Sequence, residues 1–96
     1  MDEMEKRASE VADLLKVLAN ENRLLILCEL SKEPQCVGSL LEKLNISQSG
    51  LSQHLSILKA NGILDHTKKA QNVIYSLKDE RVIKLLDVLN DTYCGI

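Results

Sequence analysis

Apolar residues recur along this chain with two different periods, one typical of helices and one typical of strands. The first segment, Asp2–Ala19, carries them four and three positions apart, at Met4, Ala8, Val11, Leu15 and Leu18. This spacing predicts a helix with a narrow apolar seam. Asn20 is a suitable N-cap for a second helix, and residues 24–30 within it are apolar nearly all round, which predicts a buried helix.

Two short helices are predicted in the middle of the chain. Residues 31–35, which contain the only proline, are predicted to form a loop before them. The helices are expected over Val37–Leu44 and Gln48–Asn61, and Ser47 supplies an N-cap for the second. Gly62 suits the left-handed conformation that often ends a helix. Two short helices joined by a few residues are typical of a helix-turn-helix.

Strand periodicity follows this motif. Segments Ile63–Lys69 and Asn72–Leu77 are predicted to pair as a hairpin through a short polar turn, because apolar residues alternate in the second segment. A last helix is predicted over Asp79–Thr92. The order of elements predicts a mainly α fold with a small β-hairpin wing, a winged helix-turn-helix, spanning residues 1–96 as one domain.

Composition limits the classes of protein to which this chain can belong. It has 96 residues, 45% of them hydrophobic and 27% charged, which is typical of a globular protein. No apolar run approaches the roughly 18 residues that a membrane span needs, and the acidic start does not resemble a secretory signal. The odd count of three cysteines excludes a fully paired disulfide framework within one chain. We therefore expect a cytoplasmic protein with free thiols.

Charge is distributed unevenly along the chain. The formal net charge is -2, yet residues 47–78 carry four lysines and one aspartate, a local charge of +3. Residues 1–46 sum to -3 and residues 79–96 to -2. The positive block coincides with the predicted helix-turn-helix and wing, where such a fold meets the DNA backbone. The aromatic content of 2% argues against stacking on single strands and favours duplex DNA.

The predicted helix Gln48–Asn61 has an apolar face and an opposite face of short or amide side chains. Such a polar face also occurs on ordinary solvent-exposed helices, but the basic wing beside it favours DNA binding. Glutamine can pair with adenine in the major groove, serine can bond to several groups, and lysine neutralises phosphates. The predicted DNA-binding residues are Ser47, Gln48, Ser49, Ser52, Gln53, Ser56, Lys68, Lys69 and Gln71.

The apolar seams of the first and last helices need a partner. They can pack on each other within one chain, and we expect that they also form the interface of a homodimer. A symmetric dimer presents two recognition helices to an inverted repeat of duplex DNA. The predicted interface residues are Val11, Leu15, Leu18, Val82, Leu86, Leu89 and Tyr93.

Three segments, Leu18–Leu24, Ile46–Leu55 and Val73–Leu77, together with the order of elements, resemble the ArsR/SmtB family of bacterial repressors. The resemblance covers essentially the whole chain. It implies a dimeric winged helix-turn-helix repressor that binds double-stranded operator DNA and is released from it by an inducer. A module that dimerises and binds another protein instead of DNA is one alternative.

Many members of that family sense metals, and this chain departs from both of their ligand patterns. Where the thiolate-site members have Cys-Val-Cys, this chain has Cys36-Val37-Gly38, with one thiol in place of two. The other members need histidines on the last helix, and residues 79–96 contain none. His54 and His66 belong to no recognisable ligand cluster. A metal-responsive repressor is therefore an alternative, and we expect no metal, no other cofactor and no catalytic residue.

Cys28 and Cys94 resemble the cysteine pair of the persulfide-responsive branch of the family, the BigR, SqrR and HlyU-like repressors. The matching contexts are Ile26-Leu27-Cys28 and Tyr93-Cys94. The resemblance implies that reactive sulfur species are the inducer and join the two thiols through a disulfide or a polysulfide, which lowers DNA affinity. Without it, the apolar surroundings favour Cys28 as a small core residue. Cys36 has no partner in this pattern, and its role stays open. The implied targets are sulfide-detoxification genes, with toxin or biofilm genes as the alternative.

Overall fold

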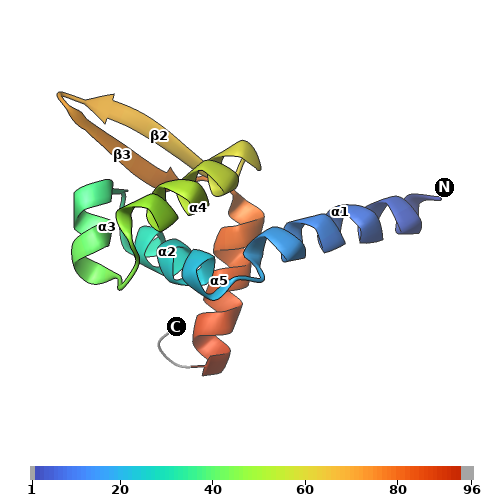
Figure 1. The fold of residues 1–96 in the computed structure, drawn as a ribbon. Coiled ribbons are helices and arrows are strands. Elements are labelled where there is room, and N and C mark those ends of the chain that lie inside the picture. Colours follow the sequence, from blue (N-terminus) through green and yellow to red (C-terminus); the bar gives the residue numbers. More distant parts are fainter. Residues whose placement is uncertain (1, 94–96) are drawn as a thin grey trace.

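The computed structural model describes residues 2–93. Within them the elements follow in the order α1 (Glu3–Leu18), α2 (Glu21–Lys32), β1 (Gln35–Cys36), α3 (Val37–Lys43), α4 (Gln48–Ala60), β2 (Leu64–Lys69), β3 (Asn72–Leu77) and α5 (Glu80–Tyr93). Figure 1 shows α2, α4 and α5 crossing in the centre, with α1 leaving this centre as an arm and β2 and β3 projecting as a wing. The predicted winged helix-turn-helix fold is confirmed.

Polar caps define where the helices begin. The Asn20 side chain accepts a hydrogen bond from the Arg23 backbone N–H at 3.1 Å, and the Ser47 hydroxyl accepts one from the Gly50 N–H at 3.1 Å. Both residues are the N-caps that the sequence predicts. Gly62 follows α4 with a φ of 74°, in the left-handed region that a residue without a Cβ adopts at low cost. These caps fix the direction in which α2 and α4 leave their turns.

The prediction of a loop over residues 31–35 is wrong at both ends of that segment. Helix α2 continues through Lys32, because the Ser31 hydroxyl and the Lys32 ammonium both bond back to the preceding turn. Gln35 and Cys36 then form β1, which pairs antiparallel with Tyr75 and Ile74 of β3. The predicted two-stranded hairpin is therefore part of a three-stranded sheet in the order β1-β3-β2. A strand of two residues is too short for an alternating pattern to reveal it.

The core is aliphatic and is built mainly from α2 and α4. Ile26 and Leu27 of α2 and Leu51 and Leu58 of α4 are completely buried. Ile63 and Val82 extend this core to the base of the wing and to α5. Burial of such side chains contributes about 1.5 to 3 kcal/mol each, so α4 is held firmly with its polar face outward.

Helix α1 contributes little to this core. Leu18 is its only buried residue, while Val11 and Leu15 expose 53% and 48% of their surface. The arm in Figure 1 is therefore a helix whose apolar seam lies largely open to solvent. Within residues 2–93, no helix combines the length and the apolar character needed to cross a membrane.

Candidate DNA-binding face and thiol site

Helix α4 separates its side chains as the sequence predicts. Leu51, Leu55 and Leu58 point into the core, and their exposed fractions are 1% or less. The opposite face brings together four of the predicted DNA-binding residues around a shallow surface hollow of about 740 Å³: Ser49, Ser52, Gln53 and Ser56. Gln48 is exposed at the first position of the same helix. The Ser47 hydroxyl is engaged as the N-cap and lies 3.4 Å from the Ser49 hydroxyl.

The wing places the remaining predicted residues away from that hollow. Lys68 and Lys69 are exposed on β2, where they pair with Val73 and Asn72 of β3. Gln71 is exposed in the two-residue turn between the strands, next to Ala70, whose φ of 57° is unusual for a residue with a Cβ. The arrangement presents lysine ammonium groups on the wing and neutral hydrogen-bonding groups on α4.

The two histidines have separate surroundings. The Nδ1 atom of His54, on α4, accepts a hydrogen bond from Nε of Arg23 at 3.3 Å. His66, on β2, has its Nε2 atom 3.5 Å from the Lys59 ammonium, and its ring centroid lies 5.9 Å from that of Tyr75. Among residues 2–93 we find no group of three or more His, Cys, Asp and Glu side chains arranged to hold a metal ion.

Arg23 is a residue of this face that the sequence reasoning missed. It lies in the first turn of α2 and lines the same hollow as the serines of α4. Its Nη1 group also donates to the Val17 carbonyl oxygen at 2.9 Å, at the end of α1. No periodicity marks a single arginine at a helix start, and only the packing of α2 against α4 brings it to this surface.

Cys28 lies on α2 beside a cavity of about 150 Å³ that α2 and α5 share. Ser31 and Lys32 line it from α2, and Leu86, Asp87 and Asn90 line it from α5. Cys28 is only 9% exposed. Burial raises the pKa of its thiol, the Lys32 charge opposes this rise, and the Glu29 charge adds to it. The Cys28 thiol is therefore mainly protonated near neutral pH. Cys94, the other predicted redox-sensing residue, lies outside the described residues.

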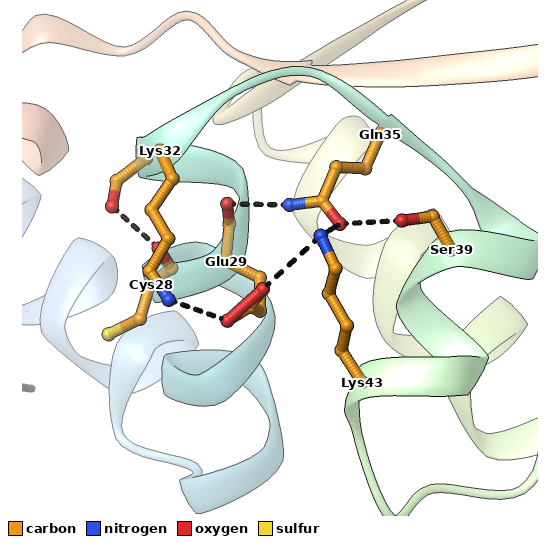
Figure 2. Close-up of polar contacts among 7 residues, drawn as sticks. Cys28, Glu29, Lys32, Gln35, Ser39 and Lys43 are labelled. Carbon is orange, nitrogen blue, oxygen red and sulfur yellow. Dashed lines mark hydrogen bonds and ion pairs between the residues drawn. The ribbon is translucent and has the colours of Figure 1, made fainter.

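A polar cluster joins the last turn of α2 to α3 (Figure 2). Glu29 accepts a hydrogen bond from Lys32 at 2.9 Å and lies 3.9 Å from the Lys43 ammonium. The Gln35 side chain donates to the Glu29 carbonyl oxygen at 2.8 Å, and its own oxygen accepts from Ser39 and Lys43 at 2.9 Å each. We call these five residues the Glu29–Gln35 cluster.

The burial of Gln35 indicates that the cluster is a defined contact between α2, β1 and α3. Gln35 is the one buried polar residue in residues 2–93, with 4% of its surface exposed. The hydrogen bond from Lys32 is the main cause that lowers the pKa of Glu29. The cluster begins directly after Cys28 in the sequence and ends on the helix that precedes α4. Cys36 lies elsewhere, half-buried on β1 as the N-cap of α3.

The predicted dimer residues differ in how deeply they are buried. Val11, Leu15 and Tyr93 are exposed, whereas Leu18 and Leu86 are buried at 4% and 6%. Leu15, Leu18, Leu86 and Leu89 line one apolar groove of about 300 Å³, together with Ala19, Leu24 and Leu85. Val82 is completely buried in the core of the chain. Its position in the last helix's apolar repeat faces the chain's own core, and its place in the dimer interface stays a prediction.

The comparisons with known proteins agree with this fold. Residues 20–66 match the model for "Bacterial regulatory protein, arsR family". Over 94 residues the chain is 43% identical to the transcriptional activator HlyU of Vibrio cholerae, covering 98% of this chain and 87% of that protein. It is 42% identical over 92 residues to the biofilm growth-associated repressor of Agrobacterium fabrum, covering 96% and 79%.

A solved structure gives the same result in three dimensions. The structure of reduced HlyU from Vibrio cholerae N16961 superposes with a TM-score of 0.92 at 42% sequence identity. The match covers 99% of this chain and 100% of that chain, so the arm, the wing and the last helix all have counterparts.

Proposed function

This chain belongs to the ArsR family of bacterial regulatory proteins, and we propose that it is a homodimeric repressor whose affinity for DNA is controlled by two thiols. Membership makes it a transcriptional regulator. The finer proposal is that it binds an inverted-repeat operator in the cytoplasm. Reactive sulfur species release it by joining Cys28 to Cys94.

The arrangement of α4 and the wing supports duplex DNA as the partner. Gln53 and the serines beside it are exposed on a helix whose other face is locked in the core. Such side chains can bond to base edges in the major groove, while Lys68 and Lys69 reach phosphates from the wing. Although the net charge is -2, the segment of residues 47–78, which contains α4 and the wing, carries a local charge of +3 that favours binding to a polyanion.

The open seam of α1 supports the homodimer. Val11 and Leu15 leave about half of their surface in water, and Leu15 also lines the apolar groove between α1, α2 and α5. A second copy related by a two-fold axis covers both grooves at once. It also sets the separation of the two α4 helices, which must match the half-site spacing of the operator.

The observation that carries the thiol proposal is the cavity between α2 and α5. Cys28 lines it from one helix, and Asn90 lines it from the other, four positions before Cys94 in the sequence. A bond from Cys28 to Cys94 would therefore link α2 to the residue that follows α5 in the sequence. The relative from Vibrio cholerae has been solved in a form described as reduced, which also supports redox chemistry in this group.

The burial of Cys28 supports one order for the proposed chemistry. Because burial raises the pKa of Cys28, the first attack falls to the Cys94 thiolate, on the terminal sulfur of a small persulfide. The S–S bond of that persulfide breaks, its thiolate leaves, and Cys94 carries the sulfur. The Cys28 thiolate then attacks the inner sulfur, which forms the disulfide and releases sulfide. The sulfane sulfur is reduced while the two thiols are oxidised. If both cysteines carry a persulfide, the same displacement gives a trisulfide and one sulfide.

The Glu29–Gln35 cluster supplies a route from this bond to the DNA-binding face. A link at Cys28 pulls on the last turn of α2, which holds Glu29 and its contacts to Lys43 and Gln35. Displacing them shifts α3 and, through the turn that follows, α4. Coupling of this kind requires only that the linked and free states differ in DNA affinity.

Mass spectrometry of the protein treated with a persulfide donor tests the proposal. We expect a Cys28–Cys94 peptide pair whose mass corresponds to a disulfide or includes added sulfur. Cys28→Ser should lose the pair, and the matched control Cys36→Ser should retain it. A crosslink that involves Cys36, or release of DNA by treated Cys28→Ser, would overturn the assignment.

A further inference from the structure

Arg23 occupies a special place between three helices. It starts α2, its Nη1 group bonds to the Val17 carbonyl oxygen of α1, and its Nε group bonds to His54 of α4. Arginine cannot accept a hydrogen bond, so Nδ1 of His54 is the acceptor and is unprotonated in this arrangement. The two bonds hold the guanidinium at the edge of the hollow that Ser49, Ser52 and Gln53 line.

The positive charge of Arg23 is not neutralised by the protein. Among residues 2–93, no carboxylate oxygen lies within 4.0 Å of it, and its two hydrogen bonds go to a carbonyl and to a neutral ring. Arg81 shows the contrast, since its Nη2 group lies 2.6 Å from the Asp79 carboxylate. Arg23 is half-buried and has no carboxylate partner, so an anion at this surface would neutralise its charge.

The guanidinium of Arg23 also has N–H groups available to bind an anion. Its two bonds leave further N–H groups in the same plane, and that fork matches the geometry of a phosphate. The neighbouring side chains of α4 are the ones expected at the DNA surface. The anion expected at this position is therefore a phosphate group of a DNA duplex bound to α4.

We propose that Arg23 is a DNA-binding residue that contacts an operator phosphate from α2, outside the helix-turn-helix and the wing. His54 is then a positioning residue, since it fixes the guanidinium toward the hollow. The inference rests on the DNA binding of the proposed function and is independent of the thiol chemistry. It adds a positive charge to the DNA-binding face beyond the lysines of residues 47–78.

The salt dependence of binding tests this contact. Phosphate contacts do not depend on sequence, so the probe is a fluorescent duplex of about 30 base pairs of arbitrary sequence. We expect Arg23→Gln to reduce the slope of log K against log salt by about 0.9 for each chain bound. Arg23→Lys should restore most of the slope, and the matched control Arg81→Gln should keep all of it. An Arg23→Gln slope equal to that of the wild type overturns the proposal, even if affinity falls.

Chemical protection gives a second test that needs no variant. We expect phenylglyoxal to modify Arg23 in the free protein and to modify it several-fold more slowly when the duplex is bound. Arg7, exposed on the arm, serves as the unprotected control. Equal modification of Arg23 with and without bound duplex contradicts the contact. If the wild-type protein binds no duplex at low salt, the proposed function fails instead.

Discussion

Helices α1 and α2 stand next to each other in the chain, yet their apolar residues have opposite surroundings. In α2, Ile26 and Leu27 are completely buried, and Leu30 is 3% exposed. In α1, Leu18 alone is buried, and Met4, Val11 and Leu15 expose between 48% and 79% of their surface. Both helices have caps and favourable charges at their ends, so local signals do not distinguish them.

This difference shows which part of the protein is complete in one chain. Most apolar residues of α2 are buried against α4, α5 and the sheet, although Leu25 is 43% exposed, so α2 is a stable support for Cys28 and Arg23. In α1 only Leu18 is buried, and only Leu14 and Val17 pack partly against the core beside it. Apolar residues spaced three and four positions apart therefore form part of the core in one helix. In the other helix the same spacing forms an apolar surface exposed to solvent.

The largest effect is expected where α2 is most buried. Leu27→Ala removes a completely buried side chain, and we expect it to lower the free energy of unfolding by about 2 to 5 kcal/mol. Urea unfolding followed by circular dichroism measures this loss. A cost below about 1 kcal/mol would mean that α2 is not the packed centre of the fold.

A substitution in α1 is expected to affect the stability of the fold less, but to weaken dimerisation clearly. Leu15→Asp should leave helix content unchanged, because nearly half of this side chain is already in water. It should weaken the dimer at least about tenfold, since a charge would then lie in the apolar interface. Sedimentation equilibrium measures the dimer constant, and Glu10→Asp on the exposed surface of the same helix is the control. An unchanged dimer would place the interface elsewhere.

The smallest effect is expected in the Glu29–Gln35 cluster. The Lys32 hydrogen bond lowers the pKa of Glu29, so this carboxylate stabilises the folded state above its unfolded pKa, and the contribution is lost as the pH falls through the lower, folded value. Glu29→Gln should therefore cost a small amount of stability at pH 7, below about 1 kcal/mol, and nothing in strong acid. Urea unfolding at pH 7 and at acid pH measures the difference. A cost that does not shrink in acid would show that the ion pairs are not its source.

Much of the fold was predictable because its signals are local. Helix starts are set by the caps Asn20 and Ser47, and the end of α4 is set by the glycine that follows it. The alternating residues of β3 likewise mark that segment as a strand. The strand Gln35–Cys36 was not predictable, because only its pairing with β3 makes it a strand. Likewise, the repeat of the last helix does not reveal that Val82 faces the core of its own chain.

The candidate site shows the same division. The polar face of α4 follows from its period, so the predicted residues Ser49, Ser52, Gln53 and Ser56 do lie together. Arg23 and Gln35 could not be found in this way. Each is a single polar residue whose importance comes from neighbours far along the chain: His54 for Arg23, and the Glu29 carbonyl and Lys43 for Gln35. Such contacts are set by tertiary packing, which one sequence does not encode in a readable pattern.

The central claim is that a bond between Cys28 and Cys94 lowers DNA affinity. The most direct measurement is the dissociation constant for a duplex selected from a random pool by the reduced protein, determined by fluorescence anisotropy before and after treatment with a persulfide donor. The account predicts at least about tenfold weaker binding after treatment, recovery on reduction by dithiothreitol, and no change for Cys28→Ser. Equal affinity of the reduced and crosslinked wild-type protein would contradict it.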